Sequence, residues 1–302
     1  MLTACDCDRI AASVPAPRVR TRYFASLLFS AALAAAPQAY ALNIVDITIA
    51  DIQTGLASRA FRAVDLVNAH LARINIYEPH YNTFMYLNPS AVADAAALDA
   101  EYAFSGPRSA LHGVPVLIKE AMDVKGLPST AGYNRFSSLA DGIGLIPESD
   151  APVVQRLRDA GAVIIGKTNI PEFSRSGNNA NTSWDGPTYN AYDRTLQAGG
   201  SSAGTAVGVA ASFGVIGTAE ETGGSIQNPA AANSLASVKT TFGLVPNAGV
   251  APLSGATRDV VGPHARTVYD AAVMLGVMAG YTLAQRHHAD ARNSEPVRRC
   301  HS

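Results

Sequence analysis

Two serines that close glycine turns, and one lysine that ends an apolar run, are the residues of this chain best suited to covalent chemistry. Ser201 follows Gly199-Gly200, Ser225 follows Gly223-Gly224, and Lys119 follows the run Val-Pro-Val-Leu-Ile. A serine hydroxyl is a weak nucleophile until a base takes its proton, and a neutral lysine can be that base. A free lysine has a pKa near ~10.4, whereas burial lowers this pKa by several units. The pattern predicts a serine hydrolase site in which a buried strand delivers Lys119.

The glycines before Ser225 suit a second requirement of acyl transfer. Gly223 and Gly224 allow the backbone to turn tightly and to aim N–H groups at one point. Convergent N–H groups of this kind form an oxyanion hole, which stabilises the negative charge of a tetrahedral intermediate. The turn before Ser225 is therefore the expected site of charge stabilisation.

Three separated motifs make the chain resemble the amidase signature family, whose hallmark is a Ser–cis-Ser–Lys triad. In chain order they are Gly113-Val114-Pro115-Val116-Leu117-Ile118-Lys119, Gly199-Gly200-Ser201-Ser202 and Thr222-Gly223-Gly224-Ser225-Ile226. The two serines at 201 and 225 lie 24 residues apart, which also fits the family. The likeness runs from roughly residue 48 to residue 277.

The resemblance implies a role for each matching residue. Ser225 would form the acyl-enzyme, Ser201 would bridge after a cis peptide bond from Gly200, and Lys119 would be the terminal base. No metal or cofactor is implied. The implied fold is α/β, with a mixed β-sheet core sandwiched by α-helices. The implied oxyanion hole consists of the backbone N–H groups of Thr222, Gly223, Gly224 and Ser225.

Other interpretations of these motifs are weaker. Lys167 also follows an apolar run, but its flanking residues are more polar than those of Lys119. His264 could form a Ser-His-Asp triad with Asp259, yet two residues five apart in one turn would not easily align with Ser225. A flexible Gly/Ser linker at 199–204 would not precede an apolar run, and a phosphate-binding loop would need G-K-[ST].

The chain departs from the family pattern at several positions. Ala219-Glu220 stand where many members carry Gly-Thr, and Gln227 stands where they carry arginine. An inward Glu220 would pair with the lysine and raise its pKa, which would hurt catalysis, so we expect Glu220 to point outward. Glu221 occupies the usual acidic position. Ala191 replaces a customary proline, which affects local rigidity.

Periodicity and turn residues predict the elements that position these side chains. Ser149-Asp150-Ala151-Pro152 has the form of a helix start, and the helix–strand sequence that follows indicates an α/β crossover. We expect the segment before residue 112 to cover the main sheet. The predicted helices are 46–55, 64–74, 91–102, 152–160, 205–211 and 268–278, and the predicted strands are 81–87, 114–118, 162–166 and 215–218.

Composition supports a globular protein and excludes some functions. The 302 residues are 48% apolar and 16% charged, and the net charge of −1 does not favour a nucleic-acid partner. Three cysteines, Cys5, Cys7 and Cys300, provide no disulfide framework. Cys5 and Cys7 could be half of a metal site, but no second pair follows them.

The amino-acid composition of both ends of the chain differs from that of the central part. A signal peptide is predicted over 1–41 from its basic arginines, its apolar stretch at 23–36 and the cleavage site Ala39-Tyr40-Ala41. The protein is therefore expected to be secreted or periplasmic, without stable membrane association after cleavage. A membrane anchor is the alternative, although the run is short. Residues 42–280 are assigned to the amidase signature domain. The His- and Arg-rich tail at 281–302 is expected to be disordered or aberrant, with the domain truncated; a metal-binding tract is the alternative.

The predicted function is hydrolysis of a small-molecule amide to an acid and an amine or ammonia through a seryl acyl-enzyme. The main alternative is a truncated, inactive remnant that at most binds ligand. A membrane-anchored binding module is a third interpretation. The sequence identifies neither the amide nor the oligomeric state, for which a homodimer is one option.

Overall fold

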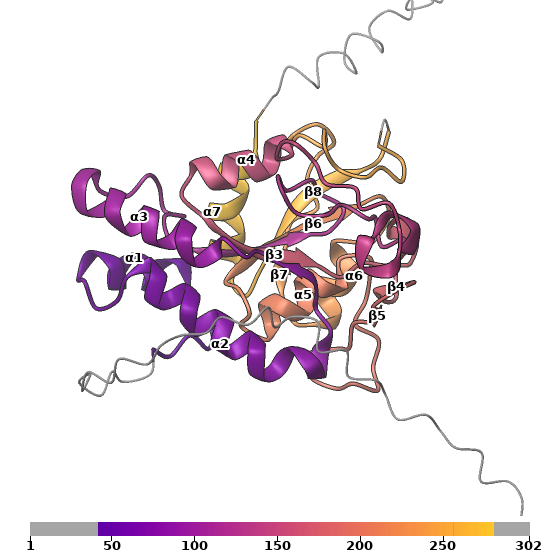
Figure 1. Ribbon diagram of the computed structural model, residues 1–302, viewed down its shortest axis with the longest axis horizontal. Helices are drawn as coiled ribbons and strands as arrows, with labels where there is room; N and C mark the ends of the chain where they lie inside the picture. Colours follow the sequence, from indigo (N-terminus) through magenta and orange to yellow (C-terminus); the bar gives the residue numbers. More distant parts are fainter. Residues whose placement is uncertain (1–41, 256, 281–302) are drawn as a thin grey trace, which may run out of the picture. The chain divides into compact units, whose positions relative to one another are not determined.

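A six-stranded mixed sheet forms the centre of the protein in a computed structural model, which describes residues 42–255 and 257–280 (Figure 1). The strand order is β1-β3-β2-β6-β8-β7. The central strand β2 runs parallel to both neighbours, and the remaining pairs are antiparallel. The bounds are β1 (Phe84–Leu87), β2 (Pro115–Lys119), β3 (Val163–Thr168), β6 (Ile216–Glu221), β7 (Ala236–Ser237) and β8 (Val260–Ala265).

Side chains alternate across β2 and so divide the core into two layers. Val116 and Ile118 belong to the cluster that α4 and α7 cover. Leu117 belongs to the opposite cluster, which holds residues of α2, α3 and α5. Figure 1 shows α4 and α7 on one side of the sheet, with α2 and α5 on the other. The helices are α1 (Ile49–Ala57), α2 (Ala63–Tyr81), α3 (Ala91–Ser105), α4 (Pro152–Asp159), α5 (Ala203–Ala210), α6 (Gln227–Ala232) and α7 (Val268–Met278).

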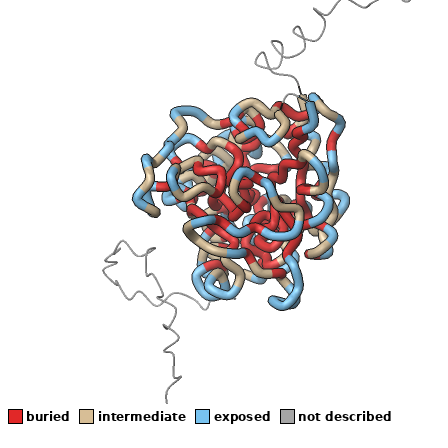
Figure 2. Tube along the Cα trace, turned by 90° about the vertical axis from the view of Figure 1, so that its right-hand side faces the viewer, coloured by how far each residue is buried: buried red, intermediate tan, exposed pale blue. Residues whose placement is uncertain are grey.

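Small residues let α5 lie directly on the sheet. Seven of its residues are buried, and a Cβ added at Gly208 would stand 2.6 Å from Leu117 Cδ1. Lys119 is two residues beyond Leu117 and therefore points to the same face as α5. The burial pattern of β2 is continuous, as expected for a central parallel strand. Figure 2 shows buried segments gathered in the interior and exposed segments around the outside.

Most of the predicted elements are confirmed. α7 has the predicted bounds, and Pro152 begins α4 as predicted, although Ala151 is the N-cap residue and no side chain caps this helix. The predicted crossover is present, because β2 and β3 are parallel with α4 between them.

Three expectations about the elements were wrong. The predicted strand at 81–87 begins only at Phe84, because α2 continues to Tyr81 and ends at Asn82 in a left-handed conformation (φ 53°). β6 continues to Glu221 rather than ending at Thr218. Asp259 and His264 were placed in one turn, whereas residues 260–265 form strand β8, which was not predicted. The predicted signal peptide and tail lie outside the described residues. The other elements are α6 and the short pieces at Asn134–Phe136, Ser138–Ala140, Glu172–Ser174, Asn181–Thr182 and Gly186–Pro187.

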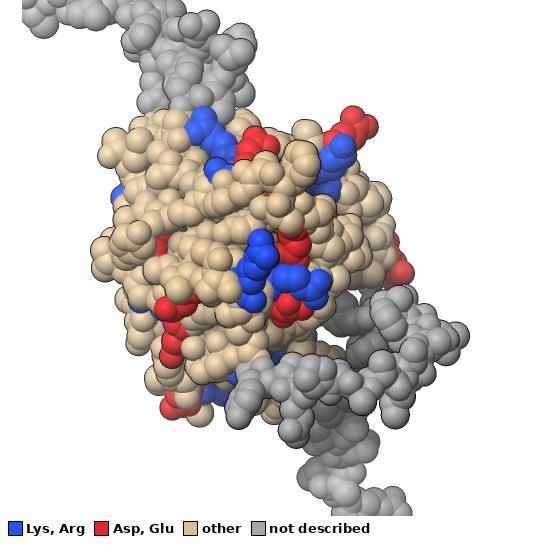
Figure 3. Space-filling model, turned by 90° about the vertical axis from the view of Figure 1, so that its left-hand side faces the viewer, with Lys and Arg blue, Asp and Glu red and all other residues tan. Residues whose placement is uncertain are grey.

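Acidic and basic side chains are interspersed on the face drawn in Figure 3. Among the described residues, no helix is long and apolar enough to cross a membrane.

Candidate active site

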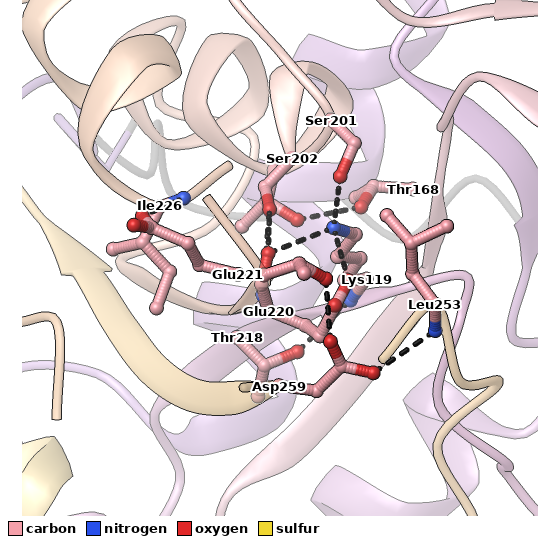
Figure 4. Close-up of polar contacts among 12 residues, drawn as sticks. Lys119, Thr168, Ser201, Ser202, Thr218, Glu220, Glu221, Ile226, Leu253 and Asp259 are labelled. Carbon is pink, nitrogen blue, oxygen red and sulfur yellow. Dashed lines mark hydrogen bonds and ion pairs between the residues drawn. The ribbon is translucent and has the colours of Figure 1, made fainter. Parts of the chain in front are cut away.

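The Lys119 amine lies at the centre of a buried polar cluster. Its Nζ is 2.6 Å from Ser201 Oγ, 3.0 Å from the carbonyl oxygen of Glu220 and 2.9 Å from Glu220 Oε2 (Figure 4). Lys119 and Ser201 are both fully buried. The structure therefore brings two of the three predicted catalytic residues into direct contact.

Strand β2 positions Lys119 through its pairing with β6. The N–H of Lys119 donates to Thr218 Oγ1 at 2.9 Å, and Val116 and Leu117 are in register with Ile216 and Gly217. This pairing places the end of β6 beside the end of β2. The amine consequently meets residues that lie about a hundred positions later in the chain.

Ser201 lies in the turn just before α5. The peptide bond between Gly200 and Ser201 is cis, as the resemblance implied. A side chain at Gly200 would collide with its neighbours, because an added Cβ would stand 2.6 Å from the Ser176 carbonyl oxygen. The adjacent Ser202 hydroxyl contacts the backbone of Glu220, with its Oγ 3.3 Å from the carbonyl oxygen. The serine pair is thus fixed against β6.

Ser225 lies beside this serine pair on the turn that follows β6. It is 6% exposed, and its carbonyl accepts a hydrogen bond from the Ser202 N–H at 3.3 Å. Within residues 42–255 and 257–280, no hydrogen bond joins the Ser225 hydroxyl to Ser201. The structure therefore holds Ser225 by a backbone hydrogen bond to Ser202, the residue next to Ser201.

The Glu221 carboxylate holds the turn around Ser225 in shape. Its oxygens accept from the N–H of Ile226 at 2.8 Å, the N–H of Gln227 at 3.1 Å and the Gln227 side chain at 2.7 Å. Burial alone would raise the pKa of Glu221, but these N–H groups and that of Gly224 hold it below its ordinary value. Gln227, which replaces the customary arginine, therefore stabilises the turn by a hydrogen bond.

The predicted oxyanion turn has the conformation that its glycines allow. Gly224 has φ 101°, a region that favours glycine, and an added Cβ at Gly223 would meet no heavy atom within 4 Å. Thr222 Oγ1 donates to Asp259, which anchors the start of the turn. The backbone at Gly223 consequently borders open space next to Ser225.

The expectation that Glu220 points outward was wrong. Glu220 is 1% exposed, and its carboxylate forms an ion pair with Lys119 at 2.9 Å (Figure 4). The reason is the length of β6: the strand continues to Glu221 and is buried along its whole length, so the side chain at 220 is buried beside the end of β2 rather than exposed beyond the strand. Burial lowers the pKa of Lys119, and the charge and hydrogen bond of Glu220 act in the opposite direction.

The competing lysine belongs to a different site. Lys167 Nζ lies 2.7 Å from the Pro128 carbonyl oxygen, 2.7 Å from Ser129 Oγ and 3.9 Å from Glu120 Oε1. It is fully buried, and burial lowers its pKa. Lys167 therefore anchors the loop after β2, and these contacts include neither Ser201 nor Ser225.

The alternative triad with histidine does not form. His264 Nε2 lies 2.8 Å from the Ile226 carbonyl oxygen, and burial lowers the pKa of His264 to about 4. Asp259 instead accepts from the N–H groups of Leu253 and Ser254. His264 and Asp259 thus bond to different partners. His264 lies within strand β8 and Asp259 directly before it, so the two residues do not share a turn.

Sequence reasoning missed two members of the polar cluster, Thr218 and Glu220. The signal that could have found Glu220 is the continuation of the buried strand past Thr218. Among the described residues, no group of three or more His, Cys, Asp or Glu side chains could hold a metal ion.

Comparisons with known proteins give matches over most of the chain. A family model described as Amidase matches residues 65–300. A glutamyl-tRNA(Gln) amidotransferase subunit of Acidothermus cellulolyticus is 37% identical over 240 residues, which is 79% of this chain and 46% of that protein. The corresponding subunit of Nitratidesulfovibrio vulgaris is 40% identical over 240 residues, covering 78% and 46%.

Solved structures show the same similarity. The peptide amidase of Stenotrophomonas maltophilia has a TM-score of 0.73 and 36% identity, over 83% of this chain and 50% of that one. An amidase family protein of Bacillus anthracis has a TM-score of 0.75 and 29% identity, with the same coverage. The chain spans about half the length of these relatives.

Proposed function

The chain belongs to the amidase signature family, and from this premise we propose that it hydrolyses a carboxylic acid amide through a seryl acyl-enzyme. The observation that carries the proposal is the buried contact of 2.6 Å between Lys119 Nζ and Ser201 Oγ. Lysine can act as a base when its amine is excluded from water and lies next to a hydroxyl, because burial disfavours the charged form of the amine.

In the proposed acylation step, neutral Lys119 takes the proton of Ser201 while Ser201 takes the proton of Ser225. The Ser225 oxygen forms a bond to the amide carbonyl carbon, and the carbonyl oxygen becomes an oxyanion. The backbone N–H groups of Thr222, Gly223, Gly224 and Ser225 are the proposed donors to this oxyanion. The proton then passes back along the relay to the leaving nitrogen as the C–N bond breaks.

Deacylation repeats the relay with water. The same base takes a proton from water, whose oxygen attacks the ester carbon and releases the acid and the Ser225 hydroxyl. The proposal requires the Ser225 and Ser201 hydroxyls to meet in the substrate complex, since catalytic hydrogen bonds often shorten only there. The backbone contact between Ser202 and Ser225 supports this, because it keeps the two turns adjacent.

The proposed substrate is a small-molecule amide. Relatives named as a peptide amidase and as amidotransferase subunits support amide chemistry for the family. We also propose that the leader directs the protein to a secreted or periplasmic location, which the mass of the mature protein would test. A leader that remains uncleaved would instead support a membrane-anchored binding module.

Hydrolysis of a panel of small aryl and alkyl amides by the purified chain tests the proposal. Activity is expected, and Ser225→Ala and Lys119→Ala should each abolish it. Ser105→Ala, an exposed serine at the end of α3, is the matched control and should retain full activity. A folded chain that hydrolyses none of the amides would favour the rival, an inactive remnant that only binds ligand.

A further inference from the structure

The contacts of Lys119 Nζ determine which way its lone pair can point. A neutral amine has two N–H donors and one lone pair, whereas an ammonium has three donors. Two of the three contacts are the Glu220 carbonyl oxygen and the Glu220 carboxylate, which can only accept. The third contact, the Ser201 hydroxyl, can donate as well as accept.

Only one arrangement therefore suits a neutral Lys119. Both N–H bonds point to the oxygens of Glu220, and the lone pair points to Ser201 Oγ. This is the orientation that proton abstraction from Ser201 needs. The role matches that of the aspartate in a Ser-His-Asp triad, which holds the base in the reactive orientation and stabilises the cation that forms.

We propose that Glu220 is a positioning residue of the site, which orients neutral Lys119 toward Ser201 and stabilises the ammonium that forms when the amine takes a proton. The proposal rests on the proposed function, since it assigns Lys119 as the base. A carboxylate 2.9 Å from an amine favours its charged form, so the ion pair delays loss of the proton as the pH rises.

Other charged groups near Lys119 act more weakly. Glu221 follows Glu220 on β6, and Asp259 precedes β8; both also favour the charged amine. His264 on β8 is buried, and its pKa is lowered to about 4, chiefly by burial and in part by the charge of Lys119. Glu220 is the residue whose carboxylate contacts Nζ directly, so its charge is the one whose removal should matter most.

Two substitutions separate the charge of Glu220 from its hydrogen bond. Glu220→Gln removes the charge but keeps a side-chain oxygen that can accept from Nζ. Glu220→Leu removes both. Glu148→Gln is the matched control, because it removes one exposed carboxylate elsewhere.

Direct titration of the Lys119 amine tests the proposal without requiring that the chain hydrolyse an amide. The chain contains four lysines, 119, 125, 167 and 239, of which Lys125 and Lys239 are exposed. Their ¹³Cε signals can be assigned with Lys125→Arg and Lys239→Arg. The midpoint of the Lys119 signal is expected to fall by about 1–3 pH units in Glu220→Gln and to stay in place in Glu148→Gln.

Amide hydrolysis measured against pH gives the second readout. The acid limb of kcat should move to lower pH in Glu220→Gln, with a plateau near that of the parent. In Glu220→Leu the plateau should also fall, by about 10- to 100-fold, because the neutral amine is no longer oriented. A merely structural Glu220 would change the melting temperature and leave the acid limb in place.

The outcomes distinguish this inference from the proposed function. A chain that hydrolyses amides but whose Lys119 midpoint and acid limb do not move in Glu220→Gln overturns the inference and leaves the function standing. A chain that hydrolyses no amide, yet shows the shifted midpoint, supports the control of the amine by Glu220 and overturns the function.

Discussion

Removing only Lys119 should destabilise the protein strongly, because it would leave the Glu220 carboxylate buried without its partner. The two side chains are 0% and 1% exposed and lie 2.9 Å apart. Breaking such a buried pair from one side typically costs about 3–5 kcal/mol, whereas replacing both partners by apolar groups of similar volume is often nearly neutral. We expect the first cost for Lys119→Met and recovery of most of it in Lys119→Met/Glu220→Met.

Urea unfolding at pH 7, followed by fluorescence, measures the four corners of this double-mutant cycle. The coupling free energy should be at least about 2 kcal/mol. Lys239→Met, which removes an exposed lysine, should change the free energy of unfolding by no more than about 0.5 kcal/mol. If the losses of the two single variants simply add in the double variant, the inward ion pair does not exist and the reasoning about Lys119 fails.

Three further predictions concern other parts of the protein. Lys167→Met should lower the free energy of unfolding by about 3–5 kcal/mol in urea titrations, since it leaves a buried carboxylate 3.9 Å away unpaired; an unchanged midpoint would contradict this. Burial lowers the pKa of His70 to about 3 and that of His264 to about 4 in the folded protein, whereas a histidine of the unfolded chain has a pKa near ~6.5. Between these values the unfolded chain binds more protons than the folded protein, so the free energy of unfolding should decrease as the pH is lowered from about 6.5 toward 4. The decrease should be up to about 1.4 kcal/mol per pH unit for each histidine, and His70→Asn should make the slope smaller. Gly200→Ala should lower the yield of folded protein through its clash with backbone oxygens, whereas Gly223→Ala, with open space around it, should fold normally by circular dichroism.

Much of the fold could be predicted because its signals are local. Hydrophobic periodicity located most helices, and Pro152, at an early helical position, marked the start of α4. The apolar run before Lys119 identified the central strand, since a strand buried on both faces has no polar side chains to interrupt it. Strand β8 was missed because Gly262, Pro263 and His264 are typical of turns, and only its pairing with β6 makes it a strand.

The composition of the site could be predicted better than its electrostatics. Lys119, Ser201 and Ser225 could be identified from the local sequence, because glycine turns precede the two serines and an apolar strand precedes the lysine. The burial of Glu220 depends instead on where β6 ends, because this strand is buried on both faces and encloses every side chain along its length. Pairing with β8 extends β6 to Glu221, and this long-range contact turns Glu220 inward.

Covalent labelling with a fluorophosphonate, followed by peptide mass mapping, tests the central claim most directly. The account predicts one adduct on Ser225, which is lost in Ser225→Ala and strongly reduced in the folded Lys119→Met/Glu220→Met variant. An adduct on another serine, or an unlabelled chain that is demonstrably folded, would contradict it.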